Sequence, residues 1–217
     1  VFTGEDIMTW FGNSIVLAAA TVAISLLVSV PAAYCFSRRR FPGRRLVLRW
    51  LVLLNSFPAI LSMFAVYRLL QPMGLINHRL GLIIVYTGTM AVFSLWNMKG
   101  YFDTIPLDIE EAARMDGCSS FAIYWRMILP IGKPILASSA LMNLIFTWNE
   151  FLTALIFLED QDLMTIPVGL NALKGEMLQE WNIQLAAVVI ASIPLIIMFL
   201  CMQKQFVKGL TAGSVKG

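Results

Sequence analysis

Five polar side chains interrupt apolar stretches of this 217-residue chain, and they are the first candidates for chemistry. Asn143, Thr147, Asn149 and Glu150 lie close together in one stretch, and Asn55 lies in another. A carboxylate within a membrane helix is costly, and it usually faces a bundle interior or a wet cavity. On a continuous helix Asn143, Thr147 and Glu150 share one face. Two readings stay open: a buried hydrogen-bonding post between helices, or a polar path for a solute.

The sequence shows no arrangement of residues that is typical of a catalytic site. The chain has no G-x-x-x-x-G-K-[ST] loop and no spacing typical of a metal site or a nucleophile. The lone His78 lies in a short polar connection, and Cys35, Cys118 and Cys201 have no metal-ligand spacing. We expect no catalytic residue, no bound metal and no cofactor in this chain. Any transport is then passive, driven by an ion gradient, or driven by a partner.

Composition excludes an ordinary soluble domain. Hydrophobic residues make up 59% of the chain, charged residues 13%, and the mean hydropathy is +0.76. A helix needs about 20 residues to cross a hydrocarbon core of roughly 30 Å. We predict an all-α, polytopic membrane bundle forming a single domain over residues 1–217. Its five spans are expected at about 12–36, 46–70, 80–97, 135–158 and 185–202.

The positions of the basic residues predict the orientation of the bundle. If the five spans alternate, thirteen of the sixteen Lys and Arg residues fall on one side, which is then cytoplasmic. They are Arg38, Arg39, Arg40, Arg44, Arg45, Arg49, Lys99, Arg114, Arg126, Lys133, Lys204, Lys208 and Lys216. A loop at 103–133 and a tail at 203–217 lie on this side, and a loop at 159–184 lies outside. The net charge of +3 therefore requires no nucleic-acid partner.

The beginning of the chain is unusual for this topology. The sequence starts at Val1, without methionine, and its short polar start falls on the external side. One further span upstream would return the N-terminus to the cytoplasm. We therefore expect that at least one helix precedes these residues.

The cytoplasmic loop at 103–133 contains the pattern of a short helix with defined ends. Asp103 or Thr104 is available as a cap, and Pro106 suits a first-turn position. Gly117 fits the left-handed position that follows a helix. The spacing predicts one face formed by Ile109, Ala112, Ala113 and Asp116, and a Glu110–Arg114 pair on the other.

A second amphipathic segment follows in the same loop. Ser119 or Ser120 can cap it, and its apolar face would consist of Phe121, Tyr124, Trp125 and Ile128. This spacing suits a helix lying in the membrane interface. From the residues alone, a docking element and an ordinary amphipathic loop remain equally open.

The loop resembles the EAA loop of ABC-importer permeases. That pattern is E-A-A, three residues, Gly, nine residues, then I-x-L-P. In this chain Glu111, Ala112, Ala113, Gly117, Leu129 and Pro130 fall in register. Met127 stands where the pattern has Ile. The long fixed spacing makes the match specific.

Further stretches resemble the carbohydrate branch of these permeases, and within it the second maltose permease subunit. They are NSIVLAAAT, AAYCFSRRRFPGRR, TWNEFLTALIFL, IPVGL and QKQFVKGLTAGSVKG. The resemblance covers nearly the whole chain, and it implies a sixth span at the N-terminus. It also implies a multi-pass subunit of the bacterial inner membrane that forms half of a translocation pathway.

The resemblance implies partners and site residues. Glu111, Ala112, Ala113, Asp116, Gly117, Leu129 and Pro130 would dock on a cytoplasmic ATPase subunit, present in two copies and holding ATP and Mg²⁺. The tail residues Gly209, Leu210, Thr211, Ala212 and Gly213 would enter the ATPase dimer interface. A second permease subunit would complete the pathway, and a solute-binding protein would meet the loop at 159–184. The alternatives are a permease for glycerol phosphate or another polar solute, or a gradient-driven transporter acting alone.

Overall fold

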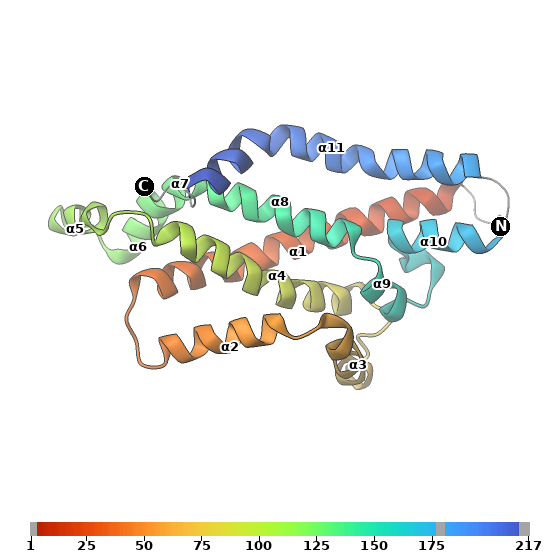
Figure 1. The fold of residues 1–217 in the computed structure, drawn as a ribbon, viewed down its shortest axis with the longest axis horizontal. Coiled ribbons are helices and arrows are strands. Elements are labelled where there is room, and N and C mark those ends of the chain that lie inside the picture. Colours follow the sequence, from red (N-terminus) through yellow and green to blue (C-terminus); the bar gives the residue numbers. More distant parts are fainter. Residues whose placement is uncertain (1–3, 177–180, 213–217) are drawn as a thin grey trace.

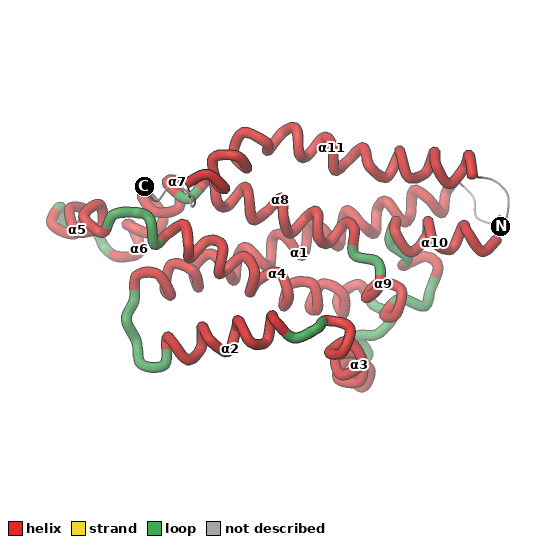
Figure 2. Tube along the Cα trace, in the orientation of Figure 1, coloured by secondary structure: helices red, strands yellow, loops and turns green. Residues whose placement is uncertain are grey.

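The computed structural model describes residues 4–176 and 181–212, and all regular structure in these ranges is helical. Figure 2 shows loops only at the connections between helices. The first half of the chain forms α1 (Gly4–Arg38), α2 (Arg44–Ser56), α3 (Ala59–Leu70), η1 (Gln71–Met73) and α4 (Arg79–Phe102). The predicted cytoplasmic loop forms α5 (Leu107–Met115), α6 (Ser120–Ile123), the π turn η2 (Tyr124–Ile128) and α7 (Leu129–Ile131). The remainder forms α8 (Lys133–Asn149), α9 (Leu152–Phe157), η3 (Gln161–Leu163), α10 (Ile166–Glu176) and α11 (Trp181–Ala212).

The centre of the bundle consists of α1, α4 and α8, with α11 packed along α8 (Figure 1). Small side chains allow these helices to approach closely: Ala18 and Ala33 of α1 are buried, as are Ser138 and Ser139 of α8. The exposed side chains of the long helices are largely aliphatic, as in Leu27 of α1. This pattern, polar and small residues inside with aliphatic residues outside, is typical of a bundle surrounded by lipid.

Two helices are long and apolar enough to cross a membrane, within Asp6–Arg38 and Arg79–Phe102. Two pairs of helices with a bend between them pass the same test when each pair is counted as one span. The described residues therefore contain up to four candidate spans. Residues 185–202, predicted as a span, lie inside α11, whose apolar stretch Leu185–Cys201 is shorter than these.

The second predicted span, 46–70, is two helices and not one. Arg44–Ser56 and Ile60–Met73 meet at 102°, with the break at Phe57 and Pro58. Proline lacks the N–H that would continue the helical ladder, and it disfavours the helical conformation of the residue before it. Phe57 accordingly has φ −73° and ψ 133°. The predicted span 135–158 is also interrupted, because α8 ends at Asn149 and α9 begins at Leu152.

Tight contacts position the helices at the end opposite α5. Gly169 of α10 packs on Trp10 of α1 so closely that a Cβ would lie 2.2 Å from the indole ring. The Asn13 side-chain amide of α1 donates to the carbonyl oxygens of Asp162 and Met164 at 2.8 and 2.9 Å. These contacts fix the predicted external segment against the first helix.

Candidate functional site

The helix α5 projects from one end of the bundle, beside α6 and α7 (Figure 1). It begins at Leu107, directly after Pro106, and no side chain caps its first turn. The predicted cap at Asp103 or Thr104 is wrong, because both residues finish α4 instead. The Asp103 carboxylate accepts hydrogen bonds from Lys99 at 2.6 Å and from Ser37 at 2.7 Å. Thr104 donates its hydroxyl to the carbonyl oxygen of Tyr101 at 2.7 Å.

The C-terminus of α5 is closed as Gly117 predicts. Gly117 has φ +81°, in the left-handed region that favours glycine. Its N–H donates to the carbonyl of Arg114 at 3.0 Å, and the N–H of Cys118 donates to that of Ala113 at 2.9 Å. This pair of bonds is the Schellman motif, which satisfies carbonyl groups left open at a helix end. The length of α5 is therefore fixed by the local sequence.

The two sides of α5 have different environments. Glu110 and Ala113 are buried, with 1% and 5% exposure, and Ile109 is half-buried beside them. Glu111 and Ala112 point to the surface together with Met115, Asp116 and Gly117. The predicted single face of Ile109, Ala112, Ala113 and Asp116 is thus divided between the two sides. Five predicted docking residues are exposed: Glu111, Ala112, Asp116, Gly117 and Pro130; Ala113 is buried and Leu129 is half-buried.

The second amphipathic segment of the loop is helical from Ser120 to Ile131, with a π turn in the middle. Ser119 caps it by accepting a hydrogen bond from the N–H of Ala122 at 3.2 Å. The predicted apolar face is divided here as well. The π turn places Ile123 and Ile128, five residues apart, in the core, whereas Phe121 and Trp125 remain exposed at 72% and 54%.

Glu110, which was predicted only to pair with Arg114, is buried and hydrogen-bonded to two residues of α1. Its carboxylate accepts from Arg38 Nε at 2.5 Å and from the Tyr34 hydroxyl at 3.0 Å. The predicted pair with Arg114 is also present: Arg114 Nη2 lies 3.4 Å from Glu110 Oε2, and the Arg114 side chain is half exposed. Glu110 lies between the apolar residues Ile109 and Ala113, which both face the bundle. This neighbourhood is the sequence signal that could have predicted the burial of Glu110. No local sequence pattern identifies Arg38, which lies 72 residues earlier, as the partner of Glu110.

Asn143 links three helices at the centre of the bundle. Its side-chain amide donates to Ser25 Oγ of α1 at 2.7 Å, and its side-chain oxygen accepts from Ser94 of α4 at 3.2 Å. All three residues are fully buried. This geometry matches the reading of a hydrogen-bonding post between helices.

Glu150 does not share a helix face with Asn143, because α8 ends one residue before it. Its carboxylate turns to the start of α9 and accepts from the N–H groups of Thr153 and Ala154 at 2.9 and 3.2 Å. It also accepts from the Tyr86 hydroxyl of α4 at 2.6 Å. Backbone donors at a helix start favour an anionic group, which offsets the cost of placing a carboxylate in a bundle.

The remaining path residues do not form a line with these two. Asn55 is exposed on α2, and Asn149 is exposed with its amide donating to the Ile145 carbonyl at 2.7 Å. Thr147 is buried, and its hydroxyl has no hydrogen-bond partner within the described ranges. Glu150 does line a cavity of about 460 Å³ between α3, α4 and α9, together with Tyr86 and Thr153.

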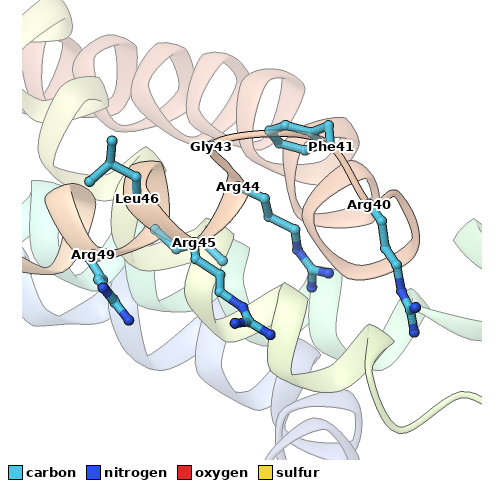
Figure 3. Close-up of a pocket in the computed structure, with 8 residues that line it drawn as sticks. Arg40, Phe41, Gly43, Arg44, Arg45, Leu46 and Arg49 are labelled. Atoms are coloured by element: carbon cyan, nitrogen blue, oxygen red, sulfur yellow. The ribbon is translucent and has the colours of Figure 1, made fainter.

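The basic connection between α1 and α2 forms a second polar surface at the α5 end. It encloses a pocket of about 950 Å³ lined by Arg40, Phe41, Gly43, Arg44, Arg45, Leu46, Leu48 and Arg49. Figure 3 shows the guanidinium groups of the four arginines extending to one side of the loop, and Leu46 to the other. Positive charge is therefore concentrated at the end that the orientation prediction places in the cytoplasm.

The predicted tail contact falls at the end of α11. Gly209, Leu210, Thr211 and Ala212 form its last turn, and Gly213 lies outside the described residues. The C-terminal end of α11 reaches the same end of the molecule as α5 (Figure 1). The predicted external loop contains α10 at the opposite end.

The sequence matches the family described as the binding-protein-dependent transport system inner membrane component over residues 25–212. It is 38% identical to a probable ABC transporter permease, YurM, of Bacillus subtilis, over 98% of this chain and 71% of that protein. It is 36% identical to the galactooligosaccharide permease GanQ of the same organism, over 100% and 78% of the two chains. It is 35% identical to the maltose/maltodextrin permease MalG of Salmonella typhimurium, over 97% and 73%.

The fold is also similar to a solved structure. A bacterial ABC transporter that imports the acidic polysaccharide alginate contains a chain with a TM-score of 0.80 and 29% identity. The match covers 93% of this chain and 76% of that one. Sequence and fold lead to the same conclusion: the chain belongs to the family of binding-protein-dependent transport system inner membrane components, the permease subunits of ABC importers.

Proposed function

We propose that this chain forms half of the translocation pathway for a sugar or oligosaccharide in the bacterial cytoplasmic membrane. A second permease subunit completes the pathway, and two copies of a separate ATPase subunit bind ATP and Mg²⁺. The names of the similar permeases, which transport galactooligosaccharides and maltodextrins, support a carbohydrate cargo. A permease for glycerol phosphate or another polar solute is the alternative.

The observation that carries this proposal is the exposed side of α5. Glu111, Ala112 and Asp116 lie on a short helix that projects from the bundle and is closed by Gly117. The small Ala112 side chain permits close approach of another helix or groove, while the two carboxylates can pair with basic groups of a partner. We infer that this side docks on the ATPase subunit and receives its motion.

We propose fewer residues for the cargo path than the sequence pattern predicted. Of the five polar candidates, Glu150 lines the cavity between α3, α4 and α9, where Tyr86 adds an aromatic ring with a hydroxyl group. Hydroxyl-rich solutes bind to surfaces that combine aromatic rings with a few placed polar groups. Asn143 is assigned to the helix post, because it is fully buried and its side chain joins Ser25 of α1 to Ser94 of α4.

The test of docking is copurification of the ATPase subunit with the tagged chain in detergent. Glu111→Lys introduces a charge of the wrong sign at the docking surface, and we expect it to lose most of the bound ATPase subunit. Glu159→Lys is a matched control, because Glu159 is an exposed carboxylate in the predicted external loop. Full retention of the ATPase subunit by Glu111→Lys would remove this side of α5 from the docking surface.

The cargo class requires a separate experiment. The solute-binding protein that copurifies with the complex is screened by thermal shift against maltodextrins, galactooligosaccharides, trehalose and glycerol phosphate. Stabilisation by a sugar supports the proposal. Stabilisation by glycerol phosphate alone establishes the alternative, and uptake by the chain without any partner contradicts both.

A further inference from the structure

The ion pair between α1 and α5 is almost completely withdrawn from solvent. The side chains of Arg38 and Glu110 are 6% and 1% exposed, and Arg38 Nε lies 2.5 Å from Glu110 Oε1. The other carboxylate oxygen, Oε2, accepts from the Tyr34 hydroxyl at 3.0 Å. Removing two charges from water is expensive, and a packed apolar contact of the same volume is often at least as stable. Stability alone therefore gives a weak reason for a buried ion pair at this place.

The geometry of Arg38 fixes the position of α5 in two places. While Nε contacts Glu110 in the first turns of the helix, Nη2 donates to the carbonyl oxygen of Ile105 at 2.8 Å, just before the helix starts. A guanidinium group is planar, so its donors hold a fixed relation to each other. Apolar neighbours such as Ile105 and Ala113 can slide, but this fork sets both the rotation and the register of α5 on α1.

We propose that Arg38 and Glu110 are positioning residues that make α5 and the cytoplasmic end of α1 one rigid body, so that motion received by α5 passes directly into the first helix. This inference rests on the proposed docking of α5 on the ATPase subunit. The side of α5 that carries Glu111, Ala112 and Asp116 is exposed, and the side that carries Glu110 is locked to α1. Consecutive residues on a helix point about 100° apart, so one short helix presents both surfaces.

The test separates transmission from folding with an apolar double variant, Arg38→Met with Glu110→Leu. Replacing both partners of a buried ion pair preserves packing and leaves no unpaired charge, so the bundle is expected to fold. Spin labels are attached at Leu27→Cys, an exposed position of α1, and at the native Cys118 after α5, with Cys35 and Cys201 replaced by serine. The distance between the labels is measured in the full importer complex, first without nucleotide and then with ATP and vanadate.

We expect the wild-type complex to give one narrow distance distribution that is the same in both states. The double variant should keep its ATPase subunit, but its distribution should broaden and shift when ATP and vanadate are added. ATP hydrolysis should continue, while the stimulation of hydrolysis by the solute-binding protein should fall about tenfold, which is typical of a lost coupling between sites.

Three single variants complete the design. Arg38→Lys keeps the charge, but an ammonium group cannot bind Glu110 and Ile105 at the same time in the fixed geometry of a guanidinium group. We expect a distance distribution whose width lies between those of the wild type and the double variant. Tyr34→Phe keeps the ion pair and should behave as wild type in the distance measurement. Arg40→Met removes an exposed arginine two residues farther along and should also leave the distribution unchanged.

Two results would overturn the inference while leaving docking intact. One is a double variant whose distance distribution stays narrow and whose stimulated hydrolysis is normal. The other is a wild-type distance that already changes with nucleotide. By contrast, a wild-type α5 that binds no ATPase subunit would contradict the proposed function itself, and copurification detects that outcome separately.

Discussion

At the scale of single residues, Glu110 and Glu111 are neighbours in the chain but differ in environment. Glu110 is enclosed and hydrogen-bonded to α1, whereas Glu111 is exposed on the projecting side of α5. The difference arises from the helical rotation between consecutive residues. The motif residue Glu111 is thus available to a partner, and the residue before it holds the helix in place.

Gly117 gives the residue-scale prediction. Gly117→Val places a β-branched residue at φ +81°, which costs about 1–2 kcal/mol for a residue with a Cβ. No atom lies within 4 Å of the added Cβ, so the effect comes from the backbone and not from a clash. We expect α5 to be misplaced and the yield of copurified ATPase subunit to fall, with membrane insertion unchanged.

The matched control for this position is Gly117→Asn. Asparagine tolerates the left-handed conformation better than other side chains, so Gly117→Asn should retain most of the ATPase subunit. Equal retention by the valine and asparagine variants would show that the Schellman ending does not position α5 for docking.

At the scale of elements, α1 is the helix that contacts the segments proposed to meet partners. It packs against α4 and α8 in the centre, against α10 at one end, and holds α5 by an ion pair at the other. Polar contacts at these places are specific, since Ser25, Ser94 and Asn143 satisfy one another inside the bundle. These contacts link α1 to its neighbours at its centre and at both of its ends.

The Asn143 post gives the element-scale prediction. Asn143→Val removes the amide that joins α1, α4 and α8, and interhelical hydrogen bonds of this kind in membranes contribute about 1 kcal/mol. We expect a lower thermal unfolding temperature in detergent and a weaker α1–α8 contact. The comparison is Asn149→Val, which removes an exposed amide and should change the stability little. Unchanged stability in Asn143→Val, with loss of cargo uptake, would favour the path reading.

At the scale of the whole molecule, the two ends of the bundle are different. One end carries α5, the arginine pocket and the C-terminal end of α11, and the other carries α3, α9 and α10 (Figure 1). This arrangement fits the proposed orientation, in which a partner docks from the cytoplasm at one end and a solute enters from outside at the other. Helix α1 has contacts at both ends, with α10 at one and with α5 at the other.

The C-terminal segment gives the whole-molecule prediction. Because α11 ends at the same end of the molecule as α5, deletion of residues 209–217 should remove a contact with the ATPase dimer and alter basal or stimulated ATP hydrolysis in the purified complex. Subunit composition is measured alongside, so that loss of assembly is distinguished from a change in rate. Identical kinetics in the deleted and intact complexes would exclude the tail from the mechanism.

The features that the sequence by itself determined are those that depend on neighbouring residues and on solvent. Apolar runs required helices, and Gly117 predicted the end of α5. The cytoplasmic orientation that the basic residues indicate stays a prediction. Only the tertiary structure decided the bend at Pro58, the partner of Glu110 and the separate roles of Asn143 and Glu150. These depend on contacts between segments far apart in the chain: Arg38 and Glu110 are 72 positions apart, and Ser25 and Asn143 are 118 apart. The helix propensity of a segment does not predict such long-range contacts, because the packing of the helices against one another determines which buried polar groups meet.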